Sequence, residues 1–319
     1  MARVSAARAV GLVLGAAADA VVGDPRRGHP VAAFGAVASA LERLSYRDRR
    51  LSGAVHSGLL TGGAVLLGLA AELLGRRRPL VRVATTAAAT WLVLGGASLA
   101  REATAMGRLL EASDIQAARD QLPALCGRDP SGLDGTGLAR ATVESVAENT
   151  SDAVVAPLLW GAVAGVPGLL GYRAVNTLDA MIGHRARRYL RFGWAAAKLD
   201  DIANLVPSRI AAALTAACAP VVGGSARGAW QTWRRDGSAH PSPNAGQVEA
   251  AFAGALEIRL GGRTVYPYGT QERPVLGHGR SPDAGHVTRA VELSRVVGAA
   301  SVAVAVALAI ATGLRRARR

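Results

Sequence analysis

Long apolar segments alternate with polar stretches along the whole chain. Most apolar segments hold about twenty residues, the length that a helix needs to cross the hydrocarbon core of a bilayer. The pattern predicts an all-α, polytopic integral membrane helical bundle with about four to six spans, polar loops and re-entrant helices. We treat residues 1–319 as a single domain. The candidate apolar helices are residues 4–23, 53–75, 79–100, 153–175, 202–222 and 296–314, and the polar motif regions are 101–152, 176–201 and 223–295.

Two of the apolar segments have unusual features. The segment 4–23 contains Arg8 and Asp19 and is followed directly by a polar motif, so we prefer an uncleaved membrane helix to a signal peptide. The segment 153–175 contains two prolines, and interior proline kinks or ends a helix. We therefore expect 153–175 to form a re-entrant or shallow helical hairpin that keeps the polar stretches on its two sides together.

The polar regions predict further elements. Residues 101–119 indicate a surface helix, and a second helix should begin near Leu138. Residues 223–295 are polar and rich in turn residues, so we expect loops there, with one helix at 249–260.

Carboxylates recur at helical spacing before the proline-broken segment. Glu144 and Glu148 are four residues apart and share one helix face, which Ser151 and Asp152 continue. Burying such groups is costly unless they are paired or bind something. A solvated face with unrelated acids is the alternative interpretation.

A second polar constellation follows that segment. Asn176 and Asp179 are three residues apart, and Asp200 and Asn204 are four apart. The adjacent pair Asp200 and Asp201 repels unless a cation or an arginine neutralises it, and a hard divalent cation with oxygen ligands is the natural partner. The arginines of residues 185–191 suit either membrane anchors or phosphate contacts.

Composition supports a membrane protein. The chain is 50% hydrophobic, and its mean hydropathy is +0.23. The net charge of +14 comes from arginines in short clusters beside apolar segments, which suits the flanks of membrane helices better than a nucleic-acid groove. Because Arg47 to Arg50 and Arg76 to Arg78 flank the same segment, charge leaves its orientation open. Cys126 and Cys218 indicate neither a disulfide framework nor a zinc site.

Several familiar catalytic patterns are absent from the sequence, including the Walker phosphate loop and the H-E-x-x-H zinc motif. The ordered polar motifs instead resemble the CobD/CbiB family, adenosylcobinamide-phosphate synthase, over nearly the whole chain. Gln247 and Val248 depart from the family pattern of an aromatic and a proline, and Ala196 stands where serine is usual. The motifs are Gly23 to Pro25 with His29 and Pro30, Gly127 to Asp129, Glu144 to Asp152, Asn176 to Gly183, Phe192 to Asn204, and Ser242 to Gly246 with Gly254, Ala255, Gly261 and Gly262.

The resemblance implies a multi-pass enzyme of the cell membrane that works in cobalamin (vitamin B12) biosynthesis. It would consume ATP with Mg²⁺ to join (R)-1-aminopropan-2-ol O-phosphate, or aminopropanol itself, to the f propionate of adenosylcobyric acid, giving adenosylcobinamide (phosphate). The implied partners are these small molecules and the lipid bilayer, with other corrin-pathway enzymes as a further expectation and no nucleic acid.

This chemistry suggests roles for the polar residues, because a carboxylate must be activated before an amine can attack it. We expect Glu144 to deprotonate the amine, and Lys198, Arg128 and Arg209 to meet phosphate charge. The expected Mg²⁺ ligands are Glu148, Asp152, Asp200 and Asp201; with Glu144 and Lys198 they form the catalytic set. The expected substrate-binding residues are Asp24, His29, Arg128, Asp129, Asn149, Ser151, Asn176, Asp179, Asn204, Arg209, Ser242 and Asn244.

Two rival functions remain open at this point. Broken apolar helices that carry Asn and Asp are typical of transport sites, so a membrane transporter is one alternative. A non-catalytic membrane scaffold for corrinoids is the other. No internal repeat is evident in the sequence, and the polar motifs lie in loops and at helix ends, which favours the enzyme.

Overall fold

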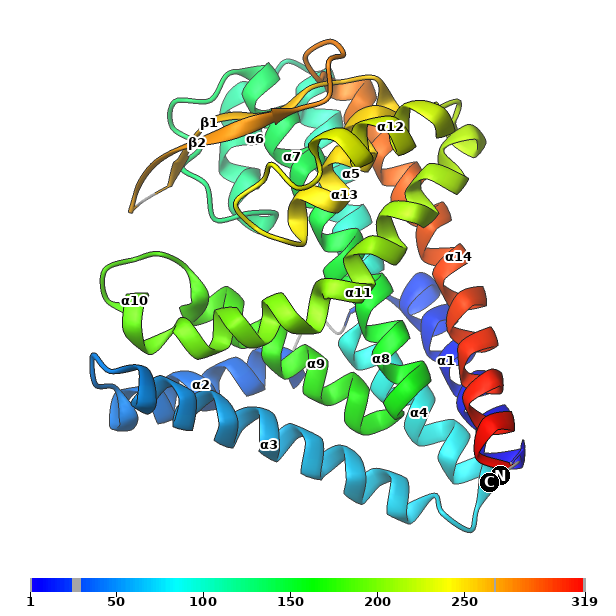
Figure 1. The fold of residues 1–319 in the computed structure, drawn as a ribbon. Helices are drawn as coiled ribbons and strands as arrows, with labels where there is room; N and C mark the ends of the chain where they lie inside the picture. Colours follow the sequence, from blue (N-terminus) through cyan, green and yellow to red (C-terminus); the bar gives the residue numbers. More distant parts are fainter. Residues whose placement is uncertain (1, 25–29, 267, 318–319) are drawn as a thin grey trace. The chain divides into compact units, whose positions relative to one another are not determined.

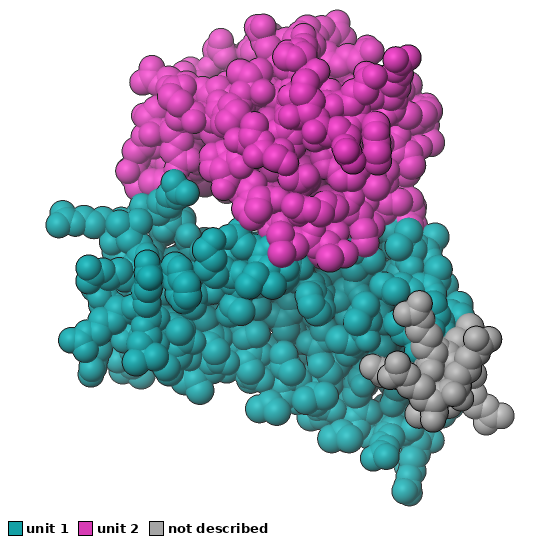
Figure 2. Space-filling view, viewed as in Figure 1, with its two compact units in different colours: residues 1–95, 156–204, 301–319 teal, residues 96–155, 205–300 magenta. Residues whose placement is uncertain are grey.

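The computed structural model describes residues 2–24, 30–266 and 268–317 (Figure 1). It is an all-α fold with one two-stranded sheet in the described part of the chain. The chain divides into two compact units, each assembled from separate segments (Figure 2). Unit 1 comprises residues 1–95, 156–204 and 301–319, and unit 2 comprises residues 96–155 and 205–300.

Five helical segments of the described chain are long and apolar enough to cross a membrane, a number within the predicted range of four to six. The shortest has 18 residues, close to the ~20 that a span needs, and the other four are longer than that. The protein is therefore a polytopic membrane protein. The candidate spans are Ser5–Val22, Arg50–Leu74, Pro79–Glu111, Trp194–Val222 and Ala284–Gly313.

Unit 1 consists of closely packed helices. Glycines allow this close approach: a Cβ atom at Gly11 or Gly15 would collide with a threonine of α4, and one at Gly68 would collide with the backbone of Pro167. Small residues serve the same purpose at helix interfaces in membranes generally. The elements are α1 (Ala2–Val22), α2 (Pro30–Ser45), α3 (Arg50–Leu74), α4 (Pro79–Val93), α8 (Ala156–Ala164), α9 (Val166–Leu178), the π-helix η3 (Asp179–Gly183), α10 (Tyr189–Phe192), and parts of α11 (Trp194–Cys218) and α14 (Ala284–Ala317).

The proline-broken segment folds as a helical hairpin, as the sequence predicted, with α8 and α9 joined at Gly165 (φ +70°). Arg8, inside the first apolar segment, donates to the carbonyl oxygens of Ala162 and Val163, both at 3.2 Å, and pairs with Glu72 at 3.3 Å. These bonds satisfy carbonyl groups that the end of a helix leaves free. The charge of Arg8 thus has a structural role at this turn.

In unit 2, helix α7 packs against α5, α6, α13 and β1. Its core includes Met106, Leu122, Leu138 and Phe252, all fully buried. Helices α12 and α13 touch at Gly228 and Gly254, where a Cβ atom on either glycine would meet the backbone of the other. The elements are α5 (Gly96–Glu111), α6 (Ile115–Gln121), η1 (Leu122–Ala124), α7 (Gly135–Thr150), the π-helix η2 (Ser151–Val155), η4 (Ala219–Val222), α12 (Ala226–Asp236), α13 (Ala245–Leu256), β1 (Leu260–Tyr266), β2 (Gly269–Leu276), and parts of α11 and α14.

Strands β1 and β2 form an antiparallel hairpin in which Leu260 pairs with Leu276 and Tyr266 with Gly269. The register shifts between Leu260 and Gly262, and both glycines there have positive φ, 85° for Gly261 and 82° for Gly262. Glycine tolerates this conformation without steric cost. The irregularity leaves the Gly261 N–H free to bond a side chain of α7.

Three expectations about elements were wrong. Residues 223–295 are mostly helix and hairpin, whereas we expected mainly loops. Helix α13 is buried along its whole length although it has no long apolar run, because its small alanines and glycines pack close to their neighbours. Segment 79–100 is interrupted at Leu94, whose extended backbone separates α4 from α5, so the candidate span Pro79–Glu111 consists of these two helices in succession. The last helix begins at Ala284, far before the predicted residue 296.

Candidate functional site

Helix α7 places the first predicted acids in unit 2. Asp134 caps its N-terminus by accepting from the Gly137 N–H at 2.8 Å. Glu144 lies on a buried face of the helix, and Glu148, one turn later, is exposed. The π-helix that follows carries Ser151, which is buried, and Asp152, which is half-buried. The acids therefore lie in different environments, which excludes a uniformly solvated face.

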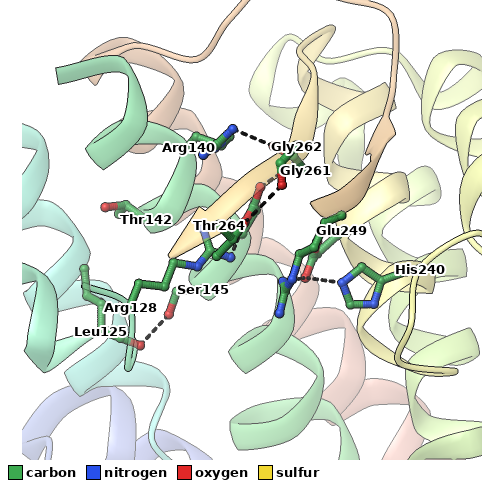
Figure 3. A network of polar contacts seen from close by, with 12 residues as sticks. Leu125, Arg128, Arg140, Thr142, Ser145, His240, Glu249, Gly261, Gly262 and Thr264 are labelled. Atoms are coloured by element: carbon green, nitrogen blue, oxygen red, sulfur yellow. Dashed lines mark hydrogen bonds and ion pairs between the residues drawn. The ribbon is translucent and has the colours of Figure 1, made fainter. Parts of the chain in front are cut away.

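Glu144 is locked in its charged form. The side chain is 1% exposed, forms an ion pair with the buried Arg128, and accepts from the Gly261 N–H at 2.7 Å. Figure 3 shows both partners, Arg128 and Gly261. Burial by itself raises the pKa of Glu144, but Arg128 and the Gly261 N–H outweigh it and hold the pKa below its usual value. A carboxylate stabilised in this way is a weak base.

Glu249 has the opposite environment. It lies on α13 with its side chain 1% exposed, and neither carboxylate oxygen accepts a hydrogen bond from the described residues. Oε1 of Glu249 lies 4.0 Å from His240 Nε2 (Figure 3) and 3.9 Å from Arg273 Nη1, and both distances are too long for hydrogen bonds. Burial and the nearby Glu144 raise the pKa of Glu249 to about 8, although Arg273 opposes the rise.

His240 and Arg273 also present unused donors. His240 Nδ1 accepts from the Ser242 N–H at 3.0 Å, so the neutral imidazole carries its hydrogen on Nε2, toward Glu249. Burial and Arg273 lower the pKa of His240 to about 4. Arg273 donates from Nη2 to the Tyr266 hydroxyl at 2.5 Å, while its buried Nε has no partner in the described chain. Each such unsatisfied polar group costs about 1–3 kcal/mol.

Glu148 differs from both buried glutamates because its side chain is exposed. The surrounding protein removes part of its hydration and raises its pKa, and Arg273 and Arg128 oppose this rise.

In unit 1, the second predicted constellation is a connected network around Asp200. This carboxylate accepts from Asn176 Nδ2 at 3.3 Å and from Asn204 Nδ2 at 3.0 Å. Tyr172 in turn donates to Asn204 Oδ1 at 2.9 Å. Asp201 has a separate partner, Lys198, at 3.0 Å on a more exposed side. Helical spacing thus brought Asp200 and Asn204 together, and the fold added an amide from α9.

The remaining predicted residues mainly bond their own loops and helices. Asp129 accepts from the Ser131 N–H at 2.9 Å, and Asn149 donates to the Ser145 carbonyl one turn back at 2.9 Å. Ser242 caps the start of α13 by accepting from the Asn244 N–H at 3.3 Å and the Ala245 N–H at 3.2 Å. Asn244 Oδ1 accepts from Ser208 at 3.2 Å and Arg209 at 3.4 Å. The residues that depart from the family pattern, Ala196, Gln247 and Val248, are all buried in the structure.

The predicted site residues fall in both units, and His29 lies outside the described residues. Unit 2 contains Arg128, Asp129, Glu144, Glu148, Asn149, Ser151, Asp152, Arg209, Ser242 and Asn244, and unit 1 contains Asp24, Asn176, Asp179, Lys198, Asp200, Asp201 and Asn204.

The donor set suits Mg²⁺ only with help from a ligand. In residues 2–24, 30–266 and 268–317, no three His, Cys, Asp or Glu side chains gather where they could hold a metal ion. The four predicted metal ligands are divided two and two between the units. Mg²⁺ commonly takes one or two protein carboxylates and completes its shell with phosphates and water. One or two carboxylates from Asp200 and Asp201, which are consecutive, or from Glu148 and Asp152, one helical turn apart, would match that smaller role.

Three residues of the unit 2 cluster were not predicted from the sequence: His240, Glu249 and Arg273. One signal existed, because Glu249 is the only charged residue in a twelve-residue helix made otherwise of small, apolar and amide side chains. No sequence pattern could have connected it to His240 in the preceding loop or to Arg273 on β2. Long-range packing brings these three together.

Comparison with known proteins agrees with the motifs. The family model described as CobD/Cbib protein matches residues 12–294. A cobalamin biosynthesis protein CobD from Mycobacterium tuberculosis (strain ATCC 25618 / H37Rv) is 61% identical over 302 residues, 94% of this chain and 96% of that protein. Proteins of the same name from Chromobacterium violaceum (42% identical; 86% of this chain, 88% of that protein) and Rhodobacter capsulatus (44% identical; 81% of each) are also similar. No solved structure gives a significant match.

The family match covers most of both units and all of the polar motifs. It leaves out only the start of the N-terminal helix and the C-terminal part of the chain after residue 294. Identity at this level over nearly the full length of both proteins cannot arise from shared composition alone. The chain therefore belongs to the CobD/CbiB protein family.

Proposed function

We propose that this protein is a cobalamin-biosynthesis enzyme that forms an amide bond with consumption of ATP. The carboxylate substrate would be the f propionate of adenosylcobyric acid, and the amine would be (R)-1-aminopropan-2-ol O-phosphate or aminopropanol. The observation that carries the proposal is the 61% identity, over 94% of the chain, to a protein named for cobalamin biosynthesis. The amide-forming step is inferred from the family resemblance and from the chemistry of the polar clusters.

The reaction requires carboxylate activation, and ATP with Mg²⁺ supplies the phosphoryl group that makes the propionate reactive. The chain's own contribution is to bind and orient charged groups. Asp200, held by Asn176 and Asn204, is a preorganised carboxylate of unit 1. Arg128 is fixed in unit 2 by Glu144, and its Nη1 has no partner in the described chain, which leaves one donor for a phosphate or carboxylate oxygen.

An apolar groove in unit 1 suits the corrinoid, which is large and partly apolar. Its volume is about 580 Å³, and α2, α3, α4 and α9 line it. Arg173 is the charged residue of this lining, and it lies at 3.5 Å from Asn176 of the Asp200 network. This volume accommodates part of a corrinoid, so the groove supports contact with one apolar edge of that substrate.

The direct test is an amidation assay with purified protein in detergent. It contains adenosylcobyric acid, Mg²⁺, ATP and either aminopropanol or its phosphate, and product is detected by mass. We expect ATP-dependent product from wild type and none from Asp200→Asn, which keeps the side-chain shape but removes the charge. Glu111→Gln, on an exposed helix end, is the matched control and should retain activity.

Other outcomes would contradict the proposal. Corrinoid binding without product, from folded protein with both amines supplied, would favour the transporter or scaffold function. Full activity in Asp200→Asn would remove Asp200 from the catalytic set while leaving the reaction itself intact.

A further inference from the structure

The unit 2 cluster around Glu249 lacks a partner of a particular kind. Both oxygens of Glu249 lack donors, and His240 Nε2, Arg273 Nε and Arg128 Nη1 lack acceptors within the described chain. The side chains of Glu249 and His240 are 1% and 3% exposed. Buried polar groups are almost always hydrogen-bonded in native proteins, so these atoms require polar partners, from water or from a bound ligand.

A ligand larger than water that completes this cluster must offer donors to the carboxylate and acceptors to the nitrogens. A bare metal ion fails this requirement, because His240 and Arg273 direct N–H groups, not lone pairs, toward Glu249. A simple anion also fails, since it supplies nothing to Glu249. An amino alcohol or its phosphate ester has both parts: its ammonium donates three hydrogens, and its oxygen atoms accept from guanidinium and imidazole N–H groups.

We propose that Glu249, His240 and Arg273 form the subsite that binds the amine substrate. Glu249 accepts from the ammonium group, and His240 and Arg273 donate to the hydroxyl or phosphate oxygens of the same molecule. This inference rests on the proposed amide-forming function. It also replaces Glu144, which Arg128 and Gly261 hold as a carboxylate, as the acceptor of the substrate proton.

The proton step balances without a further reactant. The ammonium group loses one proton to the Glu249 carboxylate and becomes a neutral amine. Its nitrogen then attacks the acyl carbon of the propionyl phosphate that ATP generates under the proposed function. The C–N bond forms, the C–O bond to phosphate breaks, and the second nitrogen proton leaves with phosphate as hydrogen phosphate. Glu249 returns its proton to solvent before the next turnover.

The test compares two nucleophiles in one preparation. Aminopropanol phosphate is positively charged at its amine near neutral pH and needs both recognition and deprotonation. Hydroxylamine is uncharged there and traps an acyl phosphate as a hydroxamate without either. In Glu249→Gln, we expect the KM for aminopropanol phosphate to rise at least tenfold and kcat to fall, with the KM for ATP and the rate of hydroxamate formation close to wild type.

The controls separate a binding role from a folding defect. Glu257→Gln removes an exposed carboxylate at the end of the same helix and should behave as wild type with both nucleophiles. If Glu249→Gln does not fold, His240→Gln is the second variant, and it should raise the KM for the amine phosphate with little change in hydroxamate formation. Hydroxamate formation itself reports that a variant is folded.

The outcomes distinguish this inference from the function on which it rests. Normal amine KM and kcat in both Glu249→Gln and His240→Gln would overturn the subsite while leaving the amidation proposal in place. Equal losses with hydroxylamine and with the amine phosphate would assign these residues to carboxylate activation or to the fold. Wild-type protein that forms neither amide nor hydroxamate would overturn the proposed function and this inference together.

Discussion

The three glutamates of the unit 2 cluster show how a residue's environment decides its chemistry. Glu144 is paired and hydrogen-bonded, Glu249 is buried without a hydrogen bond from the described residues, and Glu148 is exposed. The same side chain is thus a fixed anion in Glu144, a carboxyl with a pKa raised to about 8 in Glu249, and in Glu148 an exposed acid whose pKa is raised by partial loss of hydration. Groups whose environments push their pKa values apart are typical of acid–base sites.

Removing one partner of the buried pair should strongly destabilise unit 2. We expect Arg128→Met to cost about 3 kcal/mol, because it leaves Glu144 buried with only the Gly261 N–H to stabilise its charge. Arg128→Met combined with Glu144→Gln should recover part of that loss. Thermal unfolding in detergent measures both, with Arg191→Met, whose side chain is 67% exposed, as the control that changes little. Equal melting temperatures for wild type and Arg128→Met would show that the pair is not formed.

Glu249 should make stability depend on pH. Its pKa is raised from 4.5 to about 8, so its contribution to the free energy of unfolding is fully present below pH 4.5 and is lost as pH rises through 8. His240 acts in the opposite direction: its pKa is lowered from 6.5 to about 4, so its contribution is lost only as pH falls below 6.5. The groups that face Glu249 are Glu144 and Glu148 of α7, Arg128 and Arg273, besides His240.

The window above pH 6.5 therefore isolates Glu249. Between about pH 6.5 and pH 8.5 the melting temperature of wild type should fall by several degrees, and that of Glu249→Gln should fall less. Glu257→Gln should follow wild type. Parallel curves for wild type and Glu249→Gln would mean that Glu249 already has a partner in the folded protein.

At the scale of elements, the turn between α8 and α9 depends on one glycine. Gly165 has φ +70° and ψ −148°, a backbone conformation that residues with a side chain rarely adopt, and a Cβ atom there would collide with Glu72 Oε1. We expect Gly165→Ala to destabilise unit 1 by about 2 kcal/mol or more, since it adds backbone strain and displaces the Arg8–Glu72 pair. Thermal unfolding measures the change.

Gly62 provides the matched control for this substitution. It lies within α3, and an added Cβ atom would meet nothing within 4 Å. Gly62→Ala should leave stability unchanged or raise it by up to about 1 kcal/mol, because alanine favours a helix. A Gly165→Ala protein as stable as Gly62→Ala would show that the α8–α9 turn differs from the one described.

At the scale of the whole molecule, the lengths of the apolar segments constrain the membrane topology. The first apolar arm of the α8–α9 hairpin, residues 153–164, is about 18 Å long as a helix, well short of the ~30 Å hydrocarbon core. We therefore expect residues 149 and 179 to face the same side of the membrane. In a Cys126→Ser, Cys218→Ser background, an impermeant thiol reagent should label Asn149→Cys and Asp179→Cys from one side only, and the same side for both. Labelling from opposite sides would mean that the segment spans.

The apolar pattern of the sequence by itself determined the class of fold. Transfer of a helix into a bilayer depends on the summed composition of about twenty contiguous residues, so hydropathy predicted the polytopic α-helical bundle. Local spacing likewise predicted the contact of Asp200 with Asn204, because residues four apart on a helix are neighbours. The ordered motifs predicted the family, which the comparisons confirmed.

Only the tertiary structure decided which polar groups have partners. Whether Glu249 is satisfied depends on His240, Arg273 and Glu144, which come from a loop, a strand and another helix far away in the chain. The β1–β2 hairpin was equally hidden, since Gly261 has its role through a bond to Glu144, 117 residues earlier. Burial and pairing depend on neighbours in space, and composition or periodicity along the chain does not contain that information.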